Sequence, residues 1–87
     1  MTPDEQAVLK DIQGLAGAGR VAIRNHALER MDERGLDWED VVRALMTAVS
    51  CEAQPLDRWK VEGVDLDGDA VTVVVVIELG VVVVTVF

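Results

Sequence analysis

The sequence predicts an α+β fold, in which about three N-terminal helices precede an antiparallel sheet of three to four strands. Two observations carry this prediction. Apolar residues recur at helical spacing in the first half of the chain, and after Ser50 they follow the patterns of strands. A chain of 87 residues has room for one domain with one core. We expect a single domain over 1–87, with a helix and connector at 1–19 and the rest at 20–87.

The first expected helix begins next to Thr2. Thr2 can cap a helix, Pro3 suits the first helical position, and Glu5 completes a capping box. The apolar residues of this helix recur at helical spacing: Val8, Leu9, Ile12, Leu15 and Ala16. The glycine-rich stretch 14–19 is expected to end the helix and to serve as a connector.

A short extended segment at 20–24 is expected to lead into two further helices. Asn25 is a good N-cap for a helix over 26–34, and Gly35 is its expected C-terminal stop. Asp37 caps the next helix. The apolar stripe of that helix consists of Val41, Val42, Leu45, Met46 and Val49.

The remaining residues are expected to form strands. They are an edge strand at 51–56, a half-buried strand at 58–64, a hairpin turn at 65–69, a strand apolar on both faces at 70–79 and a last strand at 81–87. The last strand offers an edge for pairing with a partner or a second copy. The apolar segment 70–87 is rich in β-branched residues and is interrupted by Glu78 and Gly80, so we expect a buried hairpin and no membrane span.

The composition limits the classes of function. A formal net charge of -8 argues against broad binding to nucleic acids or membrane surfaces. Cys51 is the only cysteine, which excludes an internal disulfide and a cysteine-based metal site, and we expect it in the core. The N-terminus lacks the basic-then-apolar order of a signal peptide, so a cytoplasmic location is expected.

The basic residues are concentrated despite the acidic balance. His26, Arg30 and Arg34 are spaced four and four, so they project from one face of the second expected helix. Such a set suits metal-free cleavage of RNA, with His26 as acid or base. The two arginines would hold the phosphate and neutralise charge on the phosphorane oxygens. The same spacing also fits ordinary surface ion pairs, such as Arg30 with Glu33.

Arg58 and Lys60 form a second basic group. On a strand they share one face, and Trp59 points to the other. One interpretation is a positive, substrate-binding sheet face that meets the helix of His26 and completes a groove. The alternative is an edge strand with charged residues that prevent aggregation and a tryptophan in the core.

The acidic turn at 65–69 does not predict a metal site. Gly68 is displaced from the position that an EF-hand requires, and Val76 stands where the bidentate glutamate should be. The glycine-rich stretch 14–19 also lacks the lysine of a phosphate-binding loop. We therefore expect neither a metal nor another cofactor.

The motif H-A-x-x-R-M-x-x-R-G at 26–35 is followed by a short helix, R-x-x-V-x-G at 58–63, a D-G turn and a valine-rich hairpin. This order resembles the small bacterial domain-of-unknown-function 4258 family over about residues 20–87. The architecture implied is similar to that of the RelE/ParE/MqsR superfamily of small toxins. The resemblance implies a toxin of a toxin–antitoxin pair, with a zinc-finger antitoxin of the MqsA or YgiT type as partner and RNA as substrate.

The chain departs from those toxins in two respects. They are commonly basic, and they often carry catalytic groups near the C-terminus, where 81–87 offers only Thr85. Two other functions therefore remain open. One is a non-catalytic interaction module that binds a partner or homodimerises through the valine-rich hairpin, and the other is an acidic immunity or decoy protein for a basic nuclease.

Overall fold

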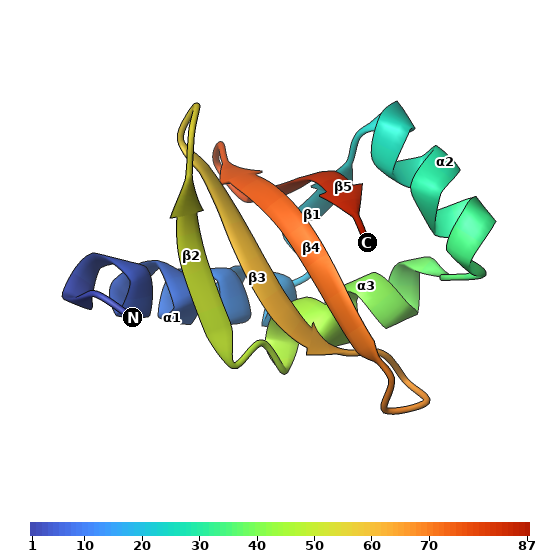
Figure 1. Ribbon diagram of the computed structural model, residues 1–87, viewed down its shortest axis with the longest axis horizontal. Coiled ribbons are helices and arrows are strands. Elements are labelled where there is room, and N and C mark those ends of the chain that lie inside the picture. The colour runs from blue at the N-terminus through green and yellow to red at the C-terminus, as the bar shows by residue number, and fades with distance from the viewer.

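Three helices and five strands make up the chain (Figure 1), which confirms the α+β class. The computed structural model describes residues 1–87. In chain order the elements are α1 (Pro3–Gly17), β1 (Val21–Ile23), α2 (Asn25–Arg34), α3 (Trp38–Met46), β2 (Ser50–Gln54), β3 (Arg58–Val64), β4 (Ala70–Ile77) and β5 (Val81–Val86). None of the helices is long and apolar enough to cross a membrane.

The strands form one sheet in the order β1-β5-β4-β3-β2. The pairs from β2 to β5 are antiparallel, but β1 runs parallel to β5, with Val21 opposite Val81 and Ile23 opposite Val83. The prediction of three to four antiparallel strands is therefore low by one or two, because the short segment at 20–24 joins the sheet. The expectation that the last strand forms an edge is wrong, since β1 covers β5 and leaves β2 as the longer edge strand.

The N-terminal capping box is confirmed. The Glu5 N–H donates to Thr2 Oγ1 at 3.1 Å, and the Thr2 N–H donates to Glu5 Oε1 at 2.8 Å. The helix continues through Gly14 to Gly17, beyond the expected start of the connector. Burial of Ala16 against the core stabilises this last turn in spite of its glycines.

The ends of α2 differ in how well they follow the prediction. The helix begins one residue early, so its N-cap is Arg24 and not Asn25. Arg24 is held there because its N–H donates to Val83 O at 3.0 Å, which continues the pairing of β1 with β5. Gly35 adopts the left-handed conformation of a C-cap, with φ 67°, as expected. Asp37 is the N-cap of α3.

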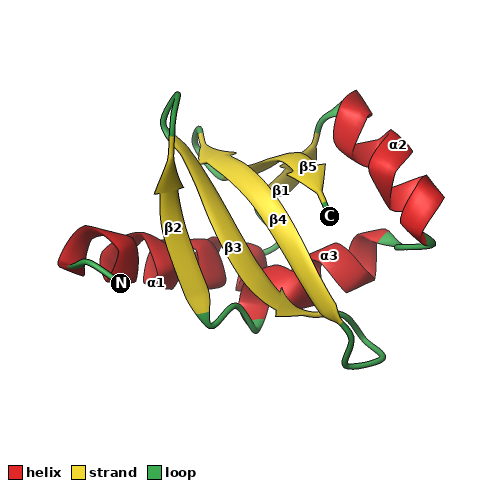
Figure 2. Cartoon of the chain, viewed as in Figure 1, coloured by secondary structure: helices red, strands yellow, loops and turns green.

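The main core lies between the sheet and two helices, α1 and α3, which cover one face (Figure 2). Its fully buried side chains include Ile12, Leu45 and Val73, and Cys51 is also buried within it. The opposite side of the sheet faces the viewer in Figure 2 and carries neither helix. We call it the open face and define it by Thr72, Val74, Val76, Val82 and Val84.

One contact between α3 and β3 leaves no room for a side chain. A Cβ at Gly63 would overlap the carbonyl oxygen of Ala44. Beside it, the Val64 N–H donates to Thr47 Oγ1 at 3.0 Å, which joins the C-terminal end of α3 to the strand. The close approach of these backbones therefore depends on glycine at position 63.

We expect Gly63→Ala to lower the free energy of unfolding by about 3 kcal/mol, because the added methyl group must displace helix backbone. Gly14→Ala is the matched control: this position in α1 is exposed and has no atom near the added Cβ. There we expect a gain of about 0.5–1 kcal/mol from helix propensity. Urea unfolding measures both changes, and equal stabilities for the two variants would contradict the packing described.

Candidate functional site

The histidine and arginine row lies on α2, as the spacing predicted. Ala27 and Met31 are buried in the main core, and the helix packs beside β5. His26 and Arg34 are exposed, whereas Arg30 is partly buried. The helix therefore has one packing face and one adjacent face that presents an imidazole and two guanidinium groups.

Arg30 connects this row to the sheet. Its Cζ atom lies 6.0 Å from the centre of the Phe87 ring, and its Nε lies 4.0 Å from Glu33 Oε2. The Phe87 N–H donates to Thr72 O at 2.8 Å, which extends the pairing of β5 with β4. By strand alternation, the half-exposed ring of Phe87 shares the open face with Thr72. Arg30 therefore stands at one border of the open face.

Arg58 and Lys60 lie on β3, at the other side of the open face. Trp59 packs against the main core, which confirms the predicted alternation. Lys60 is opposite Val74 in the sheet, and its Nζ lies 3.9 Å from Glu52 Oε2. Because β4 and β5 lie between β3 and α2, the two basic groups border one face from opposite sides and are not brought into contact.

The remaining arginines of the 20–34 segment have a structural role. The Arg20 guanidinium donates to Leu79 O, and Arg24 Nη2 lies 3.7 Å from Glu78 Oε1. Both contacts join β1 to the turn between β4 and β5. These structural contacts explain two of the four arginines in this segment.

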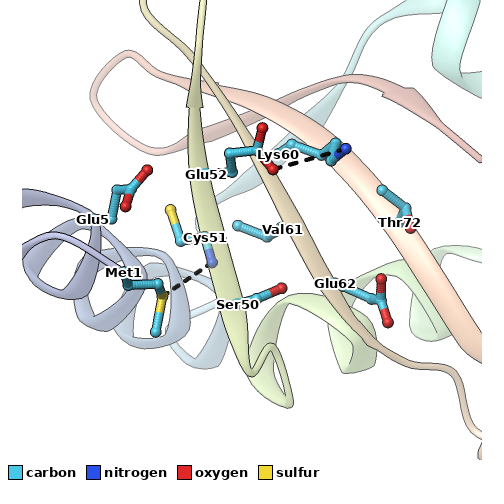
Figure 3. Close-up of a pocket in the computed structure, with 9 residues that line it drawn as sticks. All are labelled: Met1, Glu5, Ser50, Cys51, Glu52, Lys60, Val61, Glu62 and Thr72. Atoms are coloured by element: carbon cyan, nitrogen blue, oxygen red, sulfur yellow. Dashed lines mark hydrogen bonds and ion pairs between the residues drawn. The ribbon is translucent and has the colours of Figure 1, made fainter.

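A cleft of about 390 Å³ lies over β2 and β3 (Figure 3). It is lined by Met1, Glu5, Ser50, Cys51, Glu52, Lys60, Val61, Glu62 and Thr72. Of the predicted site residues only Lys60 belongs to it. Sequence reasoning missed this cleft because its rim joins the first residues of the chain to strands about fifty residues later, and no local pattern signals such a contact.

Glu5 makes two hydrogen bonds at the rim of this cleft. Besides accepting from the Thr2 N–H, its carboxylate accepts from the Ala53 N–H at 2.9 Å through Oε2. The backbone hydrogen bond from Thr2, followed by that from Ala53, lowers the pKa of Glu5 because both favour the charged form. Nearby, the Cys51 N–H donates to Met1 Sδ at 3.2 Å (Figure 3).

Cys51 does not have the surroundings of a nucleophile. Burial raises the pKa of its thiol, and the neighbouring Glu5 carboxylate raises it further. The thiolate is therefore disfavoured, as expected for a small core residue.

Hydrogen bonds within the acidic turn between β3 and β4 stabilise it. Asp65, Asp67 and Asp69 have carboxylate oxygens within 4.8 Å of one another. However, Asp65 Oδ1 accepts from the N–H groups of Asp67 and Asp69, each at 2.9 Å. These bonds explain the burial of Asp65 as a feature of the turn.

Comparison with protein families gives a match over most of the chain. A family model described as a domain of unknown function, DUF4258, matches residues 23–87, from the end of β1 to the C-terminus. No curated protein matches the chain. The matched region confirms the family expected from the motif at 26–35, and it excludes α1.

We predict that the stabilisation by Glu5 depends on pH. Because the pKa of Glu5 is lower in the folded than in the unfolded state, its contribution is fully present above the unfolded-state value of about 4.3 and disappears as the pH falls through the folded value. Urea unfolding from pH 7 to pH 3 should show Glu5→Gln less stable than the wild type at neutral pH, with a gap that closes in acid. A gap of constant size, or an equal gap for the exposed control Asp11→Asn, would contradict this role.

We also predict that Cys51 reacts slowly. Iodoacetamide at pH 8 should modify the native thiol many times more slowly than the thiol of the urea-unfolded chain, because it is both buried and protonated. Mass spectrometry follows the rate. Equal rates in the two states would show that the thiol is accessible and ionised in the fold.

Proposed function

This chain belongs to the domain-of-unknown-function 4258 family, and from that premise we propose that it is the toxin-like component of a bacterial toxin–antitoxin system. In this proposal it acts as a metal-independent endoribonuclease, and a zinc-finger antitoxin is its partner. The observation that carries the proposal is the open face, bordered by Arg30 and Lys60, with His26 exposed in the same helical row as Arg30.

The open face has the chemistry that single-stranded RNA requires. The exposed part of the Phe87 ring offers a surface on which a base can stack, and Arg30 lies beside it. Lys60 on the opposite border would supply a positive charge for a phosphate in exchange for its contact with Glu52. Between these borders, the largely buried side chains of Val74 and Val84 form an apolar floor. An RNA strand that crosses the face would therefore meet a stacking surface and cations on either side.

The chemical step would take place at the α2 border. In metal-free RNA cleavage the 2′-hydroxyl attacks the adjacent phosphate while a base removes its proton, and an acid protonates the departing 5′-oxygen. An imidazole can do either near neutral pH, which gives His26 one of the two roles. Arg30 and Arg34 would stabilise the charge that develops on the phosphorane oxygens.

A second function is favoured by a different observation. Val74, Val76 and Val84 form an apolar cluster of their own, apart from the main core, on a face that α1 and α3 leave free. A non-catalytic module could use this face to pair with a second copy of the chain. β5 is internal, so such a homodimer would form through the face of the hairpin and not through its last strand.

We expect His26→Ala to lower the rate of RNA cleavage by a factor of about 10² to 10⁴, the usual contribution of a general acid or base. The assay uses a labelled single-stranded RNA in the presence of EDTA, together with growth of cells that express each variant. Arg43→Ala is the matched control, since Arg43 is an exposed arginine on α3, away from the open face. It should cleave as the wild type does.

Equal cleavage by the wild type and His26→Ala would contradict the assigned role of the histidine. Absence of cleavage by the wild-type protein would remove the nuclease proposal as a whole. In that case light scattering decides on the second function: a homodimer supports it, and a monomer at high concentration contradicts it.

A further inference from the structure

The edge of β2 is in contact with the N-terminal segment of the chain. β2 pairs with β3 on one side only, and in an antiparallel ladder alternate N–H groups point away from the neighbouring strand. Those of Cys51 and Ala53 point outward and donate to Met1 Sδ at 3.2 Å and Glu5 Oε2 at 2.9 Å. The two outward donors of this edge are therefore satisfied by side chains and not by a strand.

Backbone carbonyl groups of a docked strand could replace Met1 and Glu5 as acceptors for the Cys51 and Ala53 N–H groups. A thioether sulfur is a weak acceptor, so a backbone carbonyl would satisfy the Cys51 N–H better than Met1 does. Glu5 divides its carboxylate between Thr2 and Ala53, and it retains the Thr2 hydrogen bond if Ala53 finds another acceptor. Met1 and Glu5 also lie outside the region that matches the family, 23–87. The N-terminal segment, which lies outside the matched region, thus covers an edge of the sheet.

The negative charge around this edge favours binding of a positively charged strand. Glu5 lies on the rim, and Glu52 and Glu62 line the adjoining cleft, where Lys60 is the one basic residue (Figure 3). Lys60 already lies 3.9 Å from Glu52. With a net charge of -8, the whole chain attracts positive partners. Lysine or arginine side chains on a docked strand would meet these carboxylates as cross-strand pairs.

A second copy of the chain fits this edge poorly. Antiparallel pairing of two β2 strands through Cys51 and Ala53 would place Glu52 directly opposite the Glu52 of the other copy. Like charges at directly opposed positions destabilise a strand pair. Glu52 therefore disfavours pairing of β2 with a second β2 strand, as charged residues on natural edge strands often do. It does not disfavour pairing with a basic strand.

We propose that the β2 edge, between Glu5 and Glu52, docks an extended segment of a partner protein that carries lysine or arginine at alternate positions. In the free chain, Met1 and Glu5 occupy the edge and keep it from other strands. The cleft beside this site shares Lys60 and Thr72 with the open face, but the outward N–H groups of Cys51 and Ala53 lie at the edge of β2. The use of this edge does not depend on ribonuclease activity.

The test uses the full-length, isotope-labelled chain and a synthetic seven-residue peptide of alternating lysine and valine. We expect the peptide to shift the amide resonances of Cys51 and Ala53 and to slow the exchange of their N–H groups. A peptide with glutamate in place of lysine should not bind. Glu52→Gln should weaken binding about two- to fivefold, the range for one cross-strand charge pair. Glu29→Gln, on α2 at the far side of the molecule, should leave the affinity unchanged.

The covering role of Glu5 is tested without the peptide. Glu5→Ala should accelerate hydrogen exchange at the Ala53 amide, whereas Thr2→Ala removes the other half of the capping box and should leave that amide protected. The proposal is overturned if the lysine peptide does not bind at millimolar concentration, if it perturbs the open face in place of β2, or if the glutamate peptide binds equally well. Equal exchange at Ala53 in the two variants would also overturn it.

Discussion

The parallel pairing of β1 with β5 is the constraint on which the candidate site depends. It consists of three residue pairs, from Val21 opposite Val81 to Ile23 opposite Val83, and the Arg24 N–H extends it by one bond to Val83. Since α2 begins at the next residue, this pairing determines where the helix starts relative to the sheet. Arg20 and Arg24 strengthen the same junction through their contacts with the turn between β4 and β5.

The position of α2 then determines which of its side chains lie beside the sheet. Burial of Ala27 and Met31 sets the rotation of the helix, and this rotation directs Arg30 toward Phe87. The same rotation leaves His26 exposed at the first turn. A helix of mixed charge in an acidic chain thus becomes one border of the sheet face that carries neither α1 nor α3, with Lys60 at the other border.

Local signals in the sequence predicted the local structure well. The capping box at Thr2, the left-handed Gly35 and the strand from Arg58 to Val64 all follow from patterns a few residues long. The pairing of β1 was not predictable in this way, because a three-residue strand carries no information about its neighbour. The sheet therefore has one or two strands more than expected, and the last strand is internal rather than an edge.

In the candidate sites too, features that depend on local patterns were predictable and features that depend on strand pairing were not. The row of His26, Arg30 and Arg34 could be read from helical periodicity alone, and so could the alternation around Trp59. Their relation to the open face could not, since it depends on the order of strands in the sheet. The edge strand expected at 51–56 is β2. The cleft and the covering of this edge were missed, because they bring Met1 and Glu5 to residues about fifty positions later in the chain.

The proposed function depends most on binding of RNA to the open face. Titration of the isotope-labelled chain with a short single-stranded RNA at low salt tests this directly by NMR. We expect shifts of the amide resonances of His26, Lys60, Thr72 and Phe87, and weaker binding as the salt concentration rises. Shifts confined to α1 and the β2 edge, or no shifts at all, would contradict it.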